Sequence, residues 1–230
     1  MKFLIFYILL LSLAALPAQH LVLAKTQQRL ATHAIVMNKG FCTSSAIGPH
    51  ALLTASHCDS SAGSIKVDES FSINILGRIT DNKDHIIYLV DGPPFKVTMG
   101  EFYSPSTYDM PREGEGVFFY GDGGGMFPPQ LRKGYRMDHL EFGKDTTPPG
   151  MPSGDLFLFD MVAITGDSGS AVYSEKTGRL IAVVTFGLFD HFAGSYALQF
   201  TQEQIDLAKN FKGGTDEHHT NTNDHLSSPK

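Results

Sequence analysis

A serine between two glycines lies in the second half of the chain, in the segment ITGDSGSAVY at residues 164–173. A serine hydroxyl attacks a carbonyl only when a base takes its proton and an acid orients that base. Gly166 and Gly169 permit backbone angles that other residues resist, so the N–H groups of Gly166 and Ser168 can point at one spot and stabilise an oxyanion. The segment predicts Ser168 as a nucleophile, Gly166 and Ser168 as an oxyanion hole, and Asp167 as an anchor of the turn. An ordinary tight turn is the alternative.

The base and the acid that such a serine needs are found in the first half of the chain. His57 closes the apolar segment LLTASHC and precedes Cys58, so a bridge at that cysteine would fix the histidine backbone. Asp84 leads into the apolar segment HIIYLV, where an aspartate can be partly buried and can hold the histidine tautomer. Asp81, in the segment DNKD with the composition of a solvated turn, is the alternative acid. His85 is predicted to be a surface or edge residue and not a second base.

The N-terminus has the layout of a secretory signal peptide at residues 1–24. A lysine at position 2 precedes an apolar run over residues 3–15, and Ala18 and Ala24 are alternative cleavage positions. A membrane anchor is the alternative, but polar residues interrupt the run before it reaches a comfortable span. We therefore expect a secreted or periplasmic protein with no stable membrane insertion after removal of the leader.

Two cysteines, Cys42 and Cys58, are the only ones in the sequence. An even pair in a chain with an export signal predicts one disulfide. Neither a Cys-x-x-Cys motif nor a second pair is present, so no metal or cofactor is expected. Three histidines near the end of the chain, in DEHHTNTNDH at residues 216–225, could instead bind a metal weakly. A formal net charge of −6 and a pI of about 5.9 give no basic footprint for nucleic acid.

Short apolar or alternating segments separated by turns recur along the chain, which is typical of an all-β sandwich or barrel. The expected strands cover residues 33–38, 40–58, 64–69, 71–80, 84–90, 114–121, 155–160, 168–174, 180–189 and 195–200. A stretch rich in Pro, Gly, Ser and Tyr at residues 91–112 is predicted to connect two halves.

One helix is predicted near the C-terminus. Thr201 and Gln204 form a capping-box pattern, and Ile205, Ala208 and Phe211 make one apolar stripe. The polar stretch that follows is predicted to be a disordered tail over residues 212–230. The segment GDGGGM at residues 121–126 lacks the spacing of a phosphate loop and is interpreted as a flexible turn.

Three of these segments together resemble motifs of the trypsin-like (chymotrypsin-fold) serine peptidases, in particular compact microbial and viral members. LLTASHC is similar to the family's histidine motif, DHIIYLV to its aspartate strand, and GDSGS to its Gly-Asp-Ser-Gly-Gly motif. The order His57, Asp84, Ser168 is the family's order, and the resemblance extends over residues 33–211.

The resemblance implies a fold and a domain division. The expected fold is all-β, with two antiparallel six-stranded β-barrels and a C-terminal α-helix. Residues 30–108 would form the N-terminal barrel that carries His57 and Asp84, and residues 112–211 the C-terminal barrel that carries Ser168. Cys42 and Cys58 occupy the positions of the family's bridge around the catalytic histidine.

Two further expectations follow from the resemblance. No Ile-Val-Gly-Gly start supplies an amino group for Asp167, so activity is expected once the leader is removed, without a zymogen switch of that kind. The substrate pocket would be lined by Val162 at its base and by Thr185, Phe186, Gly187 and Gly194 on its walls. An uncharged, roomy pocket predicts cleavage after large apolar or aromatic residues, whereas entry of His191 into the pocket would favour acidic ones.

The sequence thus predicts a secreted, monomeric serine endopeptidase that acts on polypeptide substrates through an acyl-enzyme on Ser168. The alternative is a catalytically silent protease-like module that binds peptides or partner proteins. Loss of a triad member would favour the silent module, and none is lost here.

Overall fold

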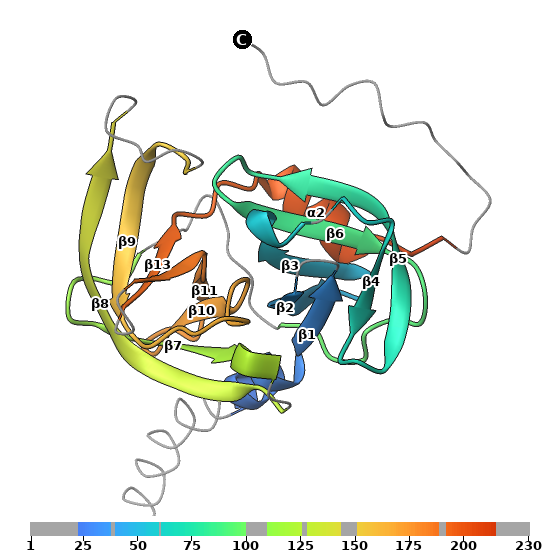
Figure 1. The fold of residues 1–230 in the computed structure, drawn as a ribbon, viewed down its shortest axis with the longest axis horizontal. Helices are drawn as coiled ribbons and strands as arrows, with labels where there is room; N and C mark the ends of the chain where they lie inside the picture. The colour runs from blue at the N-terminus through green and yellow to red at the C-terminus, as the bar shows by residue number, and fades with distance from the viewer. Residues whose placement is uncertain are drawn as a thin grey trace, which may run out of the picture.

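The structure is a computed structural model that describes residues 23–37, 40–59, 61–99, 110–125, 128–143, 151–188 and 192–214. Two curved β-sheets lie side by side, and the C-terminal helix packs on the first of them (Figure 1). The predicted leader up to residue 22, residues 215–230 of the predicted tail, and His191 lie outside the described residues.

The first sheet is a closed barrel with the strand order β1-β2-β3-β6-β5-β4. All of its strand pairs are antiparallel, as expected for sequential strands joined by short turns. The strands are β1 (Thr32–Met37), β2 (Gly40–Gly48), β3 (Ala51–Ala55), β4 (Ser64–Val67), β5 (Phe71–Thr80) and β6 (His85–Val90). Strand β6 is buried along its whole length, which explains its unbroken apolar sequence.

The second sheet has seven strands in the order β11-β10-β7-β8-β9-β13-β12 and curls into a half-barrel. They are β7 (Gly116–Gly121), β8 (Gln130–Phe142), β9 (Gly154–Asp160), β10 (Ala171–Ser174), β11 (Leu180–Val183), β12 (Phe186–Leu188) and β13 (Phe192–Tyr196). The expected all-β double barrel is confirmed, and its second sheet has one strand more than the expected six. The strand that the sequence did not predict is β8, in which no side chain is fully buried.

The C-terminal helix α2 (Gln202–Asn210) starts at the predicted capping box. The Thr201 hydroxyl accepts a hydrogen bond from Gln204 N–H, and the Gln204 side chain accepts one from Thr201 N–H. Ile205 and Ala208 are buried, as the apolar stripe predicts. The helix packs so closely on β2 that a Cβ on Gly48 would lie 2.7 Å from Ala208 O. The chain therefore returns from the second sheet to cover the first barrel.

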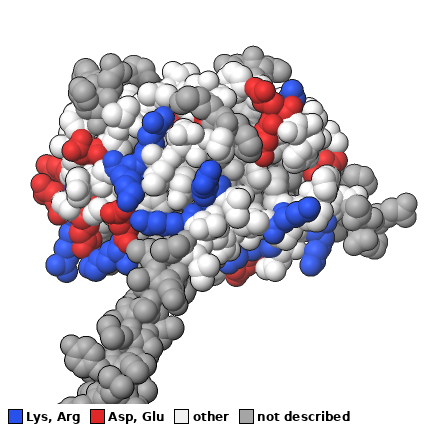
Figure 2. Space-filling model, turned by 90° about the horizontal axis from the view of Figure 1, so that it is seen from below, with Lys and Arg blue, Asp and Glu red and all other residues white. Residues whose placement is uncertain are grey.

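Residues 23–30 form a helix that packs against the turn between β10 and β11 of the second sheet. Lys25 pairs with Glu175 at 3.3 Å and lies over the Phe118 ring at 4.7 Å, and the Gln28 amide donates to Gly178 O. Basic and acidic side chains are interleaved on this face of the molecule (Figure 2). Among the described residues, no helix is both long and apolar enough to cross a membrane.

Candidate active site

His57 and Asp84 come together because the strands that carry them are neighbours. The short 3₁₀ helix η1 (Ser56–Cys58) follows β3, and Asp84 directly precedes β6, the strand that pairs with β3. Asp84 Oδ2 lies 2.8 Å from His57 Nδ1, and Asp84 Oδ1 accepts a hydrogen bond of 2.8 Å from His57 N–H. Ser56 N–H donates to Asp84 O. The carboxylate thus holds both the ring and the backbone of the histidine, which is the role of an orienting acid.

Two expectations about the neighbours of Asp84 are wrong. Asp81 does not lie in a solvated turn, and His85 is not a surface or edge residue, because both side chains are fully buried. His85 Nδ1 lies 2.7 Å from Asp81 Oδ2, so each group supplies the polar partner that a buried side chain requires. Tertiary packing against the second sheet, which the local sequence does not reveal, covers both residues.

The loop that carries Ser168 is shaped by its glycines and by the first barrel. Gly166 and Gly169 have φ values of 102° and 89°, in the region that favours glycine. A Cβ on Gly169 would lie 2.0 Å from Thr43 O. Thr43 N–H donates to Ser168 O, and the Thr43 hydroxyl donates to Gly166 O and accepts from Asp122 N–H. Thr43 of β2 therefore fixes the serine loop, a role that the sequence did not predict.

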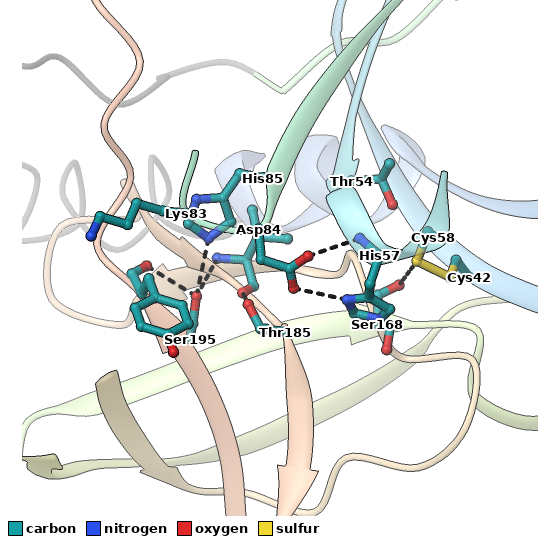
Figure 3. A network of polar contacts seen from close by, with 12 residues as sticks. Cys42, Thr54, His57, Cys58, Lys83, Asp84, His85, Ser168, Thr185 and Ser195 are labelled. Atoms are coloured by element: carbon teal, nitrogen blue, oxygen red, sulfur yellow. Dashed lines mark hydrogen bonds and ion pairs between the residues drawn. A yellow bond between two sulfur atoms is a disulfide. The ribbon is translucent and has the colours of Figure 1, made fainter. Parts of the chain in front are cut away.

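Ser168 lies next to the residue that follows His57. Cys58 Sγ is 4.0 Å from Ser168 O, and the predicted disulfide joins Cys58 to Cys42 with a Cα–Cα distance of 6.3 Å. Figure 3 shows Ser168 beside the His57 ring, with Asp84 beyond the ring. No hydrogen bond joins the Ser168 hydroxyl to His57 in the described part of the chain. In ligand-free sites such catalytic contacts are often long and tighten when substrate binds.

The two backbone amides of the predicted oxyanion hole are free donors. Within the described residues, neither Gly166 N–H nor Ser168 N–H donates a hydrogen bond, whereas the neighbouring amides of Asp167, Gly169 and Ser170 all do. Buried backbone N–H groups are nearly always paired, so two free donors beside a serine suit an incoming anionic oxygen.

The buried carboxylate of Asp167 fixes the serine loop from the interior of the protein. Its carboxylate is buried and accepts hydrogen bonds from Ile164 N–H at 2.9 Å and from Gly123 N–H at 2.8 Å. Arg132 Nε of β8 lies 3.6 Å from Asp167 Oδ2, within ion-pair distance. Burial raises the pKa of Asp167, while the two amides and Arg132 oppose that rise. Arg132 is a cationic partner for this carboxylate that the sequence did not predict, because it comes from a strand that was missed.

Gly123 belongs to the segment that was interpreted as a flexible turn. It lies in the 3₁₀ turn η2 (Gly123–Gly125), where Gly124 N–H donates to Thr165 O and Gly125 N–H donates to Asp122 O. A Cβ on Gly123 would lie 2.4 Å from the Ile164 side chain. The glycine-rich segment therefore packs directly against the serine loop.

Four of the five predicted pocket residues, Thr185, Phe186, Gly187 and Gly194, lie in or next to the hairpin of β12 and β13. Phe186 pairs with Gly194, and Thr185 N–H donates to Gly194 O. A Cβ on Gly194 would lie 2.6 Å from the Phe186 ring, so this ring covers the space that the glycine leaves. Val162 is 44% exposed, and its neighbour Ala163 contacts the hairpin at Gly187, where a Cβ would lie 2.7 Å from Ala163 O. None of the five predicted pocket residues carries a charged side chain.

The side-chain types that bind metal ions do not cluster in the part of the chain that the structure describes. Among the described residues, no group of three or more His, Cys, Asp or Glu side chains could hold a metal ion.

Comparisons with known proteins rest on structure, since no family model and no curated protein matches the sequence. The active form of the Rv3671c protease from M. tuberculosis superposes with a TM-score of 0.64 and 14% identity, over 83% of this chain and 86% of that chain. The fold is chymotrypsin-like. An inactive form of Rv3671c gives a TM-score of 0.62 and 16% identity, over 80% of this chain and 92% of that chain. An inactive mutant form of Rv3671c gives a TM-score of 0.63 and 15% identity, over 80% of this chain and 89% of that chain.

Proposed function

We propose that this protein is a secreted serine endopeptidase that cleaves polypeptides through an acyl-enzyme on Ser168. The observation that carries the proposal is the double contact of Asp84 with the ring and the backbone of His57, beside a serine loop that presents two free amides. The chymotrypsin-like fold adds support, because in such double barrels the site lies where the two sheets meet.

The groups of the proposed site act in turn during the reaction. His57 Nε2 takes the proton of the Ser168 hydroxyl as its oxygen bonds to the substrate carbonyl carbon. The carbonyl oxygen becomes an oxyanion that accepts hydrogen bonds from Gly166 N–H and Ser168 N–H, each worth about 3 kcal/mol to the transition state. His57 then gives the proton to the leaving amine, and the peptide bond breaks. Water, deprotonated by His57, releases the acyl group by the same steps, while Asp84 stabilises the imidazolium.

The proposal extends to specificity, location and assembly. The uncharged lining at Val162, Phe186 and Gly194 supports cleavage after large apolar or aromatic residues. The disulfide supports an oxidising compartment, and together with the leader-like N-terminus it supports a secreted or periplasmic protein. We expect a monomer whose catalytic parts all come from one chain, with barrels at residues 30–108 and 112–211.

Covalent labelling with a fluorophosphonate tests the proposal. The wild-type protein should be labelled on Ser168, and Ser168→Ala should abolish labelling while the protein stays folded. The matched control is Ser170→Ala, two residues away, because the Ser170 side chain is fully buried and its hydroxyl has no hydrogen-bond partner among the described residues. A labelling rate that stays constant through the pH range near 6.5, where histidine ordinarily titrates, would contradict a histidine base.

A catalytically silent peptide-binding module is the second candidate. The missing hydrogen bond between the Ser168 hydroxyl and His57 favours it. The same reaction separates the two candidates, because a silent module binds peptides but is not labelled. A digest of a peptide library, with cut sites identified by mass spectrometry, then tests the predicted preference.

A further inference from the structure

A second histidine–aspartate pair lies directly behind the first. Asp84 directly precedes β6 and His85 is its first residue, and the two side chains have different partners. Asp84 faces His57, while His85 points away from His57 toward Ser195 (Figure 3). His85 Nδ1 lies 2.7 Å from Asp81 Oδ2, and both of these side chains are fully buried. The reaction proposed above does not use this second pair.

The buried pair connects the acid-bearing turn to the second sheet. His85 Nε2 lies 3.5 Å from Ser195 Oγ on β13. Ser195 Oγ accepts a hydrogen bond from Val183 N–H of β11 and lies 3.1 Å from Tyr196 O. Asp81 also accepts from Gln199 N–H, just before α2. A chain of polar contacts therefore runs from the turn before β6 into two strands of the other sheet.

The turn that this pair holds has an unfavourable backbone. Asn82 and Asp84 have φ values of 61° and 67°, in the left-handed region that favours glycine and that asparagine and aspartate adopt only occasionally. Such conformations persist only where their surroundings fix them. On one side Ser56 N–H and His57 N–H hold Asp84, and on the other side Asp81 accepts hydrogen bonds from Lys83 N–H and Gln199 N–H besides its contact with His85.

The second sheet also approaches Asp84 itself. Tyr196, the residue after Ser195, is buried, and burial raises the pKa of its hydroxyl, with the negative charge of Asp84 adding to the rise. Strand β13 thus contacts His85 through Ser195, and the charge of Asp84 acts on the next residue, Tyr196. A change at His85 is expected to move the Asp84 carboxylate through the turn that joins the two residues.

We propose that His85 and Asp81 are positioning residues for the reaction, an inference that rests on the proposed function. They hold the left-handed backbone of Asp84 and so keep its carboxylate on His57 Nδ1. They touch no substrate, and their effect on catalysis is transmitted through Asp84.

The test compares His85→Leu with His33→Leu. The control removes a histidine from a pair of the same geometry on another strand of the first barrel, since His33 Nδ1 of β1 lies 2.7 Å from Asp68 Oδ2. His85→Leu should lower kcat by about 10- to 100-fold with little change in KM, because a misplaced catalytic group acts on the chemical step. His85→Gln, which can still donate to Asp81, should restore part of the rate. His33→Leu should leave kcat unchanged.

A second readout does not need activity. In a Ser168→Ala background, the NMR signal of the proton between His57 Nδ1 and Asp84 Oδ2 should broaden or move in His85→Leu, because a displaced carboxylate no longer accepts that hydrogen bond. His33→Leu should leave this signal unchanged. A folded His85→Leu variant with an unchanged signal would overturn the inference. If that variant does not fold, Ser195→Ala takes its place in the same measurement, and an unchanged signal would again overturn the inference. Failure of fluorophosphonate labelling in the wild type would refute the proposed function alone, since this signal still reports on the position of Asp84.

Discussion

Asp122 carries a buried carboxylate that makes folding stability depend on pH. It is 1% exposed, and neither of its carboxylate oxygens has a hydrogen-bond partner among the described residues. Burial raises the pKa of Asp122 from an ordinary 3.8 to about 7, with the negative charges of Asp68 and Asp167 adding to the rise and His33 opposing it. We therefore predict that Asp122→Asn stabilises the protein at neutral and alkaline pH.

The size and sign of the effect follow from proton binding. Between pH 3.8 and about 7 the folded protein keeps a proton on Asp122 that the unfolded chain has released. The free energy of unfolding therefore falls as pH rises through this window, and the loss is complete above it. The difference between the two pKa values corresponds to about 4 kcal/mol. Asparagine cannot ionise, so Asp122→Asn should gain up to about 4 kcal/mol over the wild type near pH 8 and differ by less than about 1 kcal/mol near pH 4.

Urea unfolding followed by far-ultraviolet circular dichroism, from about pH 4 to about pH 8, measures this difference. The control is Asp155→Asn on β9, whose side chain is exposed, so its unfolding free energy should differ from that of the wild type by a small amount at every pH. If the stability difference between Asp122→Asn and the wild type were the same at every pH, the reasoning would be refuted.

Three further predictions concern the serine loop and the first barrel. Gly169→Ala should abolish fluorophosphonate labelling, because its Cβ would clash with Thr43 O at 2.0 Å and φ is 89°; normal labelling would contradict this. Arg132→Gln should raise the pKa of Asp167 further and lower the free energy of unfolding by about 1–3 kcal/mol, measured in urea, and an unchanged midpoint would count against the ion pair. Reducing the disulfide, which closes a 16-residue separation, should cost about 3 kcal/mol in the same assay, and equal stability with and without reductant would exclude it.

The sequence was sufficient to predict a feature where the groups that determine it lie close together along the chain. The capping box at Thr201 and Gln204 closes within one helical turn, so residue types and spacing determine it. The apolar run of β6 and the glycines of the serine loop likewise reflect local requirements, namely full burial and positive φ. These local features were enough to predict the strand-rich fold and the candidate serine loop.

The sequence was insufficient where a partner comes from a distant strand. Strand β8 has no fully buried side chain, so its residues show no clear apolar alternation, and Arg132 on that strand was missed. His85 resembled a surface residue because the groups that bury it, Ser195 among them, are more than a hundred positions away. Thr43 was missed for the same reason, since its three partners, Ser168, Gly166 and Asp122, all lie in the second half of the chain.

The contacts of Thr43 have a consequence for the order of events during synthesis. The first half of the chain leaves the ribosome with His57 and Asp84 but without Ser168. The second half carries the serine, yet the amide and hydroxyl that fix the serine loop belong to β2. Under the proposed function, neither half alone would have a formed catalytic centre, so a nascent or partly folded chain would be unable to digest itself or its neighbours.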